Sequence, residues 1–493
     1  MKRVIGQWHK ENDTVDEIAE LIFQDDNIEF YRRGVDDPLC EAFIGGDTGE
    51  GSHFIVYTDG TIPVYENRTL KGAESYNVRY VVETSRNEPF YTRKPKIRAV
   101  KFEFPELSKW INERLVECFL REDGSMIAED KVLSDIILKE ANPEISIVFE
   151  SFSYENLLLT DSLTSVTLSQ HPQILIQYGN DTNLETVEKD ISTIIQFFYI
   201  MIGRITGIDD IYLFYDGDGK PDKIYLNKDF SYNSKDRTPT YQHSTTIEDV
   251  SENVTRYFSN WYSFCQKQEF DFLRRMYFIE NGRSRKYVED TFIVYVKFLE
   301  GYFWRTSGEE EKTVRLKDAV KKAQKEIKDI IFKKENGKTL FEKVIEEADI
   351  EWSYDSNHAN KISEWIAKGY LGRNSLDQIL YGLDSQCNGI LRHNATYILP
   401  KISDSDQSSD ELTRAFIKSI VLTRNYYSHF KPSSDGILTA NQLHTTNYCL
   451  KAMIINIFCL NMKIEDGLIR HILGFDKELH MQTHFLIEPL PQQ

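Results

Sequence analysis

The period of the hydrophobic pattern changes once along this chain, and that change restricts the fold more than any other feature of the sequence. Apolar and polar residues alternate in several segments of the first half, such as residues 76–83 (YNVRYVVE) and 97–104 (IRAVKFEF), as they do in strands with one buried face. Farther along, the apolar spacing becomes helical, as in residues 287–303 and 443–462. The sequence therefore predicts an α+β multidomain protein with a β-rich N-terminal domain and an all-α C-terminal domain.

A polar segment without periodicity, residues 229–248, separates the two patterns. We therefore expect a β-rich domain over residues 1–228, a linker over 229–250 and a helical domain over 251–493. The length of 493 residues favours such a division, because single hydrophobic cores seldom grow beyond about 250–300 residues.

Turn and capping residues, together with strand and helical spacing of apolar residues, predict further elements in both parts. In the front part they predict a hairpin around Asp59-Gly60, a helix over 107–119, strands over 165–170 and 174–178, and a hairpin that turns in DGDGKPD (216–222). They also predict a helix over 183–202, with a capping box of Thr182 and Glu185 and a stop at Gly203. In the back part they predict helices over 314–334, 362–370 and 410–430, the last with a capping box of Ser408 and Glu411.

Charge and cysteine usage restrict the function. The formal net charge is −19, so the whole chain should repel nucleic acid and anionic membranes, and an RNA-binding surface must be local. The clearest basic stretch, residues 312–334, holds nine Lys/Arg against three Asp/Glu and either guides RNA or is the solvated face of a packed helix. The six cysteines form no CxxC pair, which favours a reducing cytoplasm. Neither a signal peptide nor a membrane-spanning segment is predicted, so we expect a cytoplasmic protein.

Two loops resemble ligand sites only in composition. DGDGKPD lacks the full ligand spacing and the closing Glu of a calcium loop, and GGDTGEG (45–51) lacks the Gly-Lys-Ser/Thr of a phosphate-binding loop. We expect turns at both places, and neither a metal nor a cofactor for this protein.

The segment RNYYSHF, at residues 424–430, carries side chains suited to RNA chemistry. Transesterification within RNA needs a group that takes the proton of the 2′-hydroxyl and a cation that stabilises charge at phosphorus. His429 can exchange protons near neutral pH, and Arg424 offers a fork of donors that fits phosphate. Asn425 lies four residues before His429, so on a helix the two share a face, and Asn425 would orient the ring or contact phosphate.

The spacing alone is a weak signal, because Arg3 with His9 and Arg237 with His243 also fit it. The first pair lies in a terminal segment, and the second lies in the predicted linker. Only Arg424 and His429 lie near the end of a capped helix, with Asn directly after Arg. The structural alternative for this pair is a helix-end cation and a hydrogen-bonded histidine.

With these features together, RNYYSHF resembles the RNxxxH signature of HEPN ribonucleases. The plan of the whole chain resembles that of ApeA-type bacterial anti-phage proteins, on the pattern YVVE…KIRAVKFEFPELSKWI followed by strands and the helix before IDDIYLFY. The resemblance implies that the all-α domain is a HEPN-type helical domain. It also implies a catalytic set and a supporting set of residues. The catalytic set is Arg424, Asn425 and His429, and the supporting set is Glu300, Tyr427 and Ser428.

The resemblance further implies a metal-independent endoribonuclease effector of anti-phage defence that acts by abortive infection. The implied partners are an RNA substrate, with tRNA among the candidates, a phage-derived trigger for the N-terminal domain, and further copies of the chain in a homodimer or higher oligomer. The alternative is a catalytically inactive HEPN-type module for dimerisation or RNA binding, which cleavage assays in EDTA would distinguish. A metal-dependent nuclease is a third interpretation, and the sequence offers it no clustered Asp/Glu/His motif.

Overall fold

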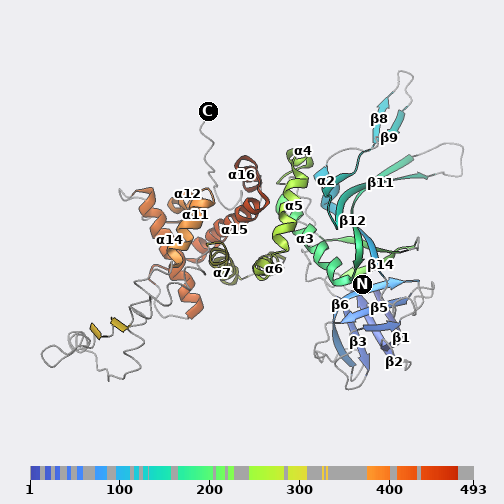
Figure 1. Ribbon diagram of the computed structural model, residues 1–493, viewed down its shortest axis with the longest axis horizontal. Helices are drawn as coiled ribbons and strands as arrows, with labels where there is room; N and C mark the ends of the chain where they lie inside the picture. The colour runs from blue at the N-terminus through green and yellow to red at the C-terminus, as the bar shows by residue number, and fades with distance from the viewer. Residues whose placement is uncertain are drawn as a thin grey trace. The chain divides into compact units, whose positions relative to one another are not determined.

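Figure 1 shows the computed structural model of the chain. The structure describes residues 2–10, 17–23, 28–33, 42–45, 53–58, 73–85, 96–111, 116–120, 126–130, 133–156, 165–203, 207–216, 220–226, 244–282, 287–307, 325–326, 329–330, 375–399, 408–429 and 435–475. The chain divides into two compact units. Unit 1 comprises Met1–Lys267, Tyr277–Lys286 and Ile455–His484, and unit 2 comprises Gln268–Met276, Tyr287–Ile454 and Phe485–Gln493.

One antiparallel sheet runs through unit 1 and joins twelve strands in the order β10-β11-β12-β7-β13-β14-β6-β3-β2-β1-β4-β5. Their bounds are β1 Lys2–Lys10, β2 Glu17–Phe23, β3 Ile28–Arg33, β4 Ala42–Gly45, β5 His53–Thr58, β6 Ala73–Thr84, β7 Ile97–Glu103, β10 Ile136–Lys139, β11 Glu144–Asn156, β12 Ser165–Thr182, β13 Asp209–Tyr215 and β14 Asp222–Leu226. A separate two-stranded sheet consists of β8 (Val116–Leu120) and β9 (Met126–Asp130).

Part of the large sheet closes on itself. β6 pairs with both β3 and β5, so β6, β3, β2, β1, β4 and β5 form a closed ring. Buried apolar side chains from these strands pack together, among them Trp8, Phe30 and Phe54. The rings of Trp8 and Phe30 meet edge to face, with centroids 5.0 Å apart. Ring closure stabilises these strands because it pairs their edges with one another.

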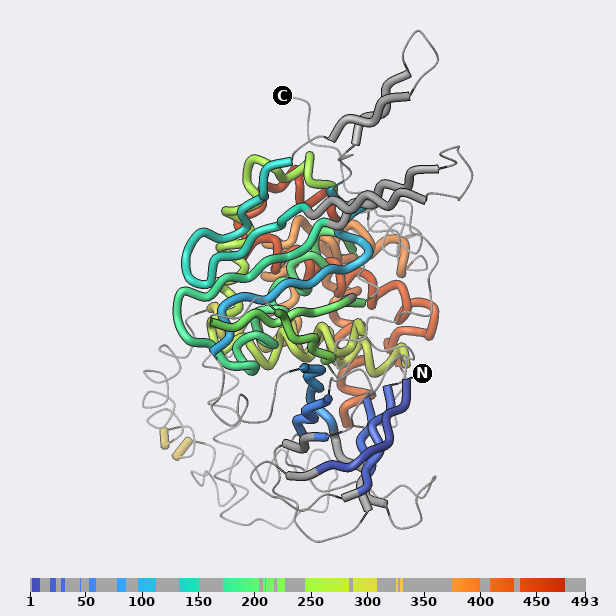
Figure 2. Tube along the Cα trace, turned by 90° about the vertical axis from the view of Figure 1, so that its right-hand side faces the viewer, coloured from blue at the N-terminus to red at the C-terminus, as the bar shows by residue number. Residues whose placement is uncertain are grey.

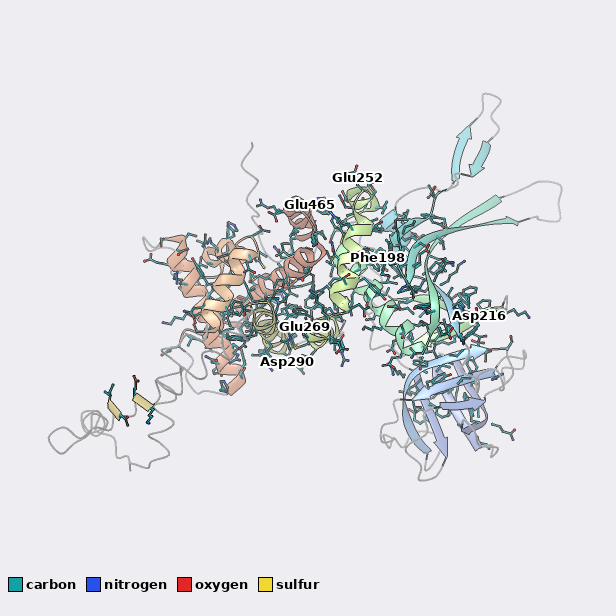
Figure 3. The ribbon with its side chains drawn as sticks, in the orientation of Figure 1. Phe198, Asp216, Glu252, Glu269, Asp290 and Glu465 are labelled. Carbon is teal, nitrogen blue, oxygen red and sulfur yellow. The ribbon has the colours of Figure 1, made fainter. Side chains whose placement is uncertain are left out.

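The remaining strands extend the sheet beyond β6, and Figure 2 shows several of them running side by side in cyan and green. The helices α2 (Pro105–Ile111) and α3 (Leu184–Ile202) carry a cluster of buried aromatic residues. Phe198 of α3, labelled in Figure 3, lies 5.2 Å from the ring of Phe104 and 5.2 Å from that of Trp110. This aromatic contact holds the two helices together.

Unit 1 also contains the helices α4 (Ile247–Val250), α5 (Val254–Cys265) and α16 (Asp466–Phe475). Buried hydrogen bonds join α5 to α3: the Trp261 indole donates to the Thr193 carbonyl at 2.8 Å, and the Tyr262 hydroxyl donates to Asp190 at 2.7 Å. The Asn260 amide donates to the Met462 carbonyl at 3.0 Å. The helix α5 therefore contacts both the N-terminal sheet region and a segment near the end of the chain.

Unit 2 contains the helices α7 (Val288–Thr306), α11 (Leu376–Gln386), α12 (Ile390–Ile398) and α14 (Ser409–His429). The helix α14 packs against the other three. The carboxylate of Asp410, near the start of α14, accepts hydrogen bonds from Tyr381 of α11 at 3.0 Å and from Arg392 of α12 at 3.1 Å. Two more helices, α6 (Gln268–Gly282) and α15 (Ala440–Met462), contribute residues to both units.

The predicted fold class is confirmed. The elements β6, β7, α7 and α15 occupy the predicted segments, and β13 and β14 form the predicted hairpin. The Ser408 N–H donates to the Glu411 carboxylate at 2.9 Å, and the Glu411 N–H donates to the Ser408 hydroxyl oxygen at 3.4 Å, which are the two bonds of the predicted capping box. Gly203 ends α3 with a φ of 89°, and its N–H donates to the Tyr199 carbonyl. The domain bounds remain a prediction.

Three predicted details of the front part are wrong. The helix expected over 107–119 ends at Ile111, because residues 116–120 pair as β8 with β9. The cap of α3 is Asn183, whose side chain accepts the Thr186 N–H, since Thr182 still belongs to β12. The strands expected over 165–170 and 174–178 form one continuous strand, β12. Its pairing with β11 continues through Pro172, which lies opposite Phe149.

Several predicted elements lie outside the described residues. They are the second strand of the hairpin around Asp59-Gly60, the helix over 362–370, and all but four residues of the basic stretch 312–334. Most of the predicted linker lies outside them as well, and α4 begins at its end.

Candidate active site

The predicted motif occupies the last six residues of α14, Arg424 to His429. One face of α14 is buried, through Leu412, Phe416, Ile420 and neighbouring residues, and it fixes the helix within unit 2. Residues 424–428 are half-buried, and His429 is exposed. The packing of this face thus fixes the orientation of the helix, and the motif lies at its C-terminal end.

Arg424 is held on two sides. Its Nη2 lies 3.3 Å from Oε2 of Glu300 on α7, and its Nη1 donates to Oδ1 of Asn425 at 3.2 Å. The Nε of Arg424 is buried and has no hydrogen-bond partner among the described residues. The side chains of Arg424 and Glu300 are 23% and 32% exposed, so water screens this ion pair and it contributes little to the stability of the fold.

His429 stands at the end of α14 and makes no hydrogen bond with any described residue. Its imidazole is exposed at this helix end. No contact joins His429 to Arg424 in the described part of this single chain, and Asn425 bonds Arg424 rather than the imidazole.

The tyrosines of the motif lie between these two residues. The rings of Tyr426 and Tyr427 have centroids 5.1 Å apart at 78°. Burial raises the pKa of the Tyr427 hydroxyl, and the charges of Glu289 and Tyr426 raise it further. Sequence reasoning missed Glu289, whose only local signal is its place in the acidic first turn of α7.

The other supporting residue, Ser428, is half-buried and makes no hydrogen bond with the described residues. Of the competing Arg–His pairs, Arg3 and His9 lie in β1, and Arg3 forms an ion pair with Glu20. Arg237 and His243 lie outside the described residues.

The acidic hairpin turn of unit 1 has a structural role. The guanidinium of Arg98 donates to both carboxylate oxygens of Asp216, labelled in Figure 3, at 2.6 and 2.7 Å. Hydrogen bonding from Arg98 lowers the pKa of Asp216. Asp222 is buried within β14, where it pairs with Leu213. Asp216 thus forms an ion pair with Arg98, and Asp222 belongs to a paired strand.

Within the described ranges, no group of three or more His, Cys, Asp or Glu residues could hold a metal ion. Burial raises the pKa of the Cys387 thiol to about 12 and also raises the pKa of Cys449 and Cys459. Those thiols are therefore protonated near neutral pH. In the part of the chain that the structure describes, no helix combines the length and apolar character of a membrane span.

Comparison with known protein families gives two matches. Residues 3–261 match the family model described as ApeA N-terminal domain 1, and residues 293–468 match the one described as Apea-like HEPN. The second match includes Glu300 and the whole of the motif from Arg424 to His429. Neither the curated proteins nor the solved structures contain a significant match to this chain.

Proposed function

The chain belongs to the ApeA family and ends in an ApeA-like HEPN domain, and from this we propose that it is an endoribonuclease effector of bacterial anti-phage defence. It cleaves RNA, with tRNA among the candidate substrates, and acts in the cytoplasm by abortive infection. The N-terminal region responds to a phage-derived trigger. This region is large enough for such a role, because it forms a sheet with its own core.

The observation that carries the proposal is the contrast between two side chains of one short motif. Glu300 and Asn425 hold the Arg424 guanidinium in place, whereas the His429 imidazole is exposed at the helix end. Pre-oriented donors stabilise developing charge without a cost of reorganisation, and an exposed imidazole can exchange protons with a substrate.

In the proposed reaction, His429 removes the proton of a ribose 2′-hydroxyl. The 2′-oxygen attacks the adjacent phosphorus, and the bond from phosphorus to the 5′-oxygen of the next nucleotide breaks. That 5′-oxygen takes up a proton, from the protonated His429 or from a second copy of it. Arg424 stabilises the charge on the phosphoryl oxygens. The products are a 2′,3′-cyclic phosphate and a 5′-hydroxyl.

A second copy of the chain gives this scheme its second acid–base group. One chain contributes one exposed His429, whereas proton removal and proton delivery occur at oxygens on opposite sides of phosphorus. We therefore include a homodimer, or a higher oligomer, that forms through the helical domain and brings two motifs together across a two-fold axis.

The test is RNA cleavage by the purified protein in EDTA, with the product ends analysed chemically. We expect cleavage with cyclic phosphate ends in the wild type and none in His429→Ala. Binding of RNA without cleavage would instead favour an inactive module for dimerisation or RNA binding. Expression of both proteins in bacteria under phage challenge, with growth and total RNA followed, tests the defence role separately.

A further inference from the structure

Thr423 directly precedes Arg424 on α14 and is fully buried. Its hydroxyl makes two hydrogen bonds: it donates to the Ser419 carbonyl at 2.7 Å and accepts the Leu438 N–H at 2.9 Å. The first bond lies within the helix, as is common for threonine. The second joins α14 to the segment that leads into α15.

The bond from Leu438 to Thr423 joins residues 15 apart in sequence, and the whole motif lies between them. Leu438 is itself buried, at 3% exposure. Nearby, Gly436 has a φ of 77°, and a Cβ added to it would lie 3.0 Å from Cδ1 of Leu422. The segment 435–438 therefore lies against the turn of α14 that precedes Arg424, and glycine permits this approach.

The far end of this segment is fixed as well. Thr439 and Gln442 form a reciprocal cap at the start of α15, with the Thr439 N–H donating to Oε1 of Gln442 at 2.9 Å. The Nε2 of Gln442 donates to the Ile398 carbonyl, at the end of α12, at 2.7 Å. The Thr423–Leu438 bond is thus anchored to the helices α12, α14 and α15.

The position of this bond matters because helix ends fray. The last four carbonyls of a helix lack helical partners, and His429 is the last residue of α14. A hydrogen bond placed just before Arg424 limits how far the fraying extends. We propose that Thr423 is a positioning residue, which fixes the end of α14 so that Arg424 and His429 keep a defined spacing. The inference rests on the proposed ribonuclease function.

The same helix supplies a matched control. Thr413 is also fully buried on α14, and its hydroxyl donates to the Ser409 carbonyl at 2.7 Å. In the described structure it accepts no second hydrogen bond. Thr413→Val and Thr423→Val therefore both replace a buried hydroxyl with a methyl group, and both lose the hydrogen bond to the carbonyl four residues earlier in the helix. Only Thr423→Val leaves the buried Leu438 N–H without its acceptor.

The experiment measures kcat and KM for RNA cleavage in wild type, Thr423→Val, Thr423→Ser and Thr413→Val. We expect kcat to fall about tenfold in Thr423→Val, because a buried N–H loses its partner, while KM changes less than about twofold. Thr423→Ser keeps the hydroxyl and should restore most of the rate. Gly436→Ala, at an exposed position, should give the same fall in kcat. This variant tests the inference if Thr423→Val fails to fold.

Amide hydrogen exchange of residues 424–429 is measured on the same proteins, and it should accelerate in Thr423→Val and not in Thr413→Val. Equal loss of kcat in the two valine variants, or an unchanged kcat in both Thr423→Val and Gly436→Ala, would overturn the inference. A wild type that leaves RNA intact would overturn the proposed function instead. Hydrogen exchange alone would then decide whether Thr423 fixes the helix end.

Discussion

Arg424 and His429 both lie within the last six residues of α14, but they differ in exposure and in hydrogen bonding. Arg424 is 23% exposed and bonded to Glu300 and Asn425, whereas His429 is exposed and makes no hydrogen bond with the described residues. A phosphate would thus meet a guanidinium that is already oriented. The imidazole would gain its partner only from the substrate, so substitutions at the two positions should have different signatures.

His429→Ala should abolish RNA cleavage and leave the fold intact. The side chain is exposed at a helix end, so its loss should change the free energy of unfolding by less than about 0.5 kcal/mol. Cleavage assays and denaturant unfolding on the same preparation measure both effects. His393→Ala, at a half-buried position in α12, is the histidine control and should cleave like the wild type. Equal cleavage by His429→Ala would refute the assignment.

Arg424→Lys keeps the charge and loses the planar fork of donors. We expect cleavage to fall by about 100-fold or more, as when one oriented donor to a transition state is removed. RNA binding should weaken by less than about tenfold, because the net charge is unchanged. Single-turnover rates and filter binding separate the two quantities. A rate near that of the wild type would show that Arg424 acts only as a positive charge.

Glu300→Gln tests whether Glu300 orients Arg424. Both side chains are partly exposed, so loss of the ion pair should lower stability by at most about 1 kcal/mol. The rate should fall several-fold, because the guanidinium loses its fixed partner. Asp290→Asn, at an exposed residue in the first turn of the same helix, labelled in Figure 3, is the control and should leave the rate unchanged. Equal effects of the two substitutions would refute the orienting role.

The motif could be predicted from the sequence because its residues lie close together in the chain. Arg424, Asn425 and His429 follow one another on a helix whose Ser408–Glu411 cap is also a local signal. Their catalytic roles stay a prediction. The charge of Glu289 acts on Tyr427 from a helix far away in the sequence, and the Thr423–Leu438 bond joins residues 15 apart. Such contacts depend on tertiary packing, which no local pattern specifies.

At the scale of elements, a buried carboxylate joins α3, β12 and α5. Asp190 is 1% exposed and accepts hydrogen bonds from Tyr178 at 3.0 Å and from Tyr262 at 2.7 Å. Burial raises the pKa of Asp190, although both tyrosine hydroxyls and the charges of Lys189 and Lys139 lower it in part. An ionised Asp190 therefore destabilises the folded state relative to a neutral side chain.

This predicts a pH-dependent difference between the wild type and Asp190→Asn. Below the ordinary carboxyl pKa both states of the wild type hold the proton. As the pH rises through the window up to the raised folded pKa, the unfolded state ionises first and wild-type stability falls. The stability of Asp190→Asn minus that of the wild type should thus increase across this window, by about 1.4 kcal/mol per pKa unit. Denaturant unfolding followed by tryptophan fluorescence measures it, since Trp261 bonds α3 nearby.

Asp135→Asn, at an exposed position near β10, is the control for that measurement and should show no such change. A constant difference between Asp190→Asn and the wild type across the acid range would contradict the prediction. A difference that decreases with rising pH would mean that Asp190 is stabilised as a carboxylate by its two tyrosine donors.

Helices with clear apolar spacing or caps could be predicted from the sequence. Elements that form through pairing with a distant strand could not. The helices α3, α7, α14 and α15 have clear helical spacing or caps, and their predicted segments agree with the structure. The helix predicted over 107–119 included residues 116–119 because Phe119 continues an apolar helical spacing, yet residues 116–120 pair as β8 with β9. Closure of the six-stranded ring through the pairing of β5 with β6 has no signature in a local pattern.

At the scale of the whole molecule, charge opposes self-association. Each chain carries a formal net charge of −19, so two copies repel unless the contact is locally favourable. Two facing motifs would also bring Arg424 and His429 of each copy near one another, where Glu300 offsets part of the charge. Added salt screens the long-range repulsion. Self-association should therefore strengthen as ionic strength rises from low values, which sedimentation at several salt concentrations can measure.

If the site is composite, an inactive copy should inhibit an active one. Titration of His429→Ala into a fixed amount of wild type should lower the cleavage rate, because each mixed dimer has one motif without its imidazole. His393→Ala, added in the same amounts, should raise the rate, since its motif is intact. The mixtures are equilibrated above the dissociation constant measured by sedimentation, so that subunits exchange. If one chain suffices for both proton transfers, the rate will stay constant at a large excess of His429→Ala, and the composite site is refuted while the ribonuclease activity stands.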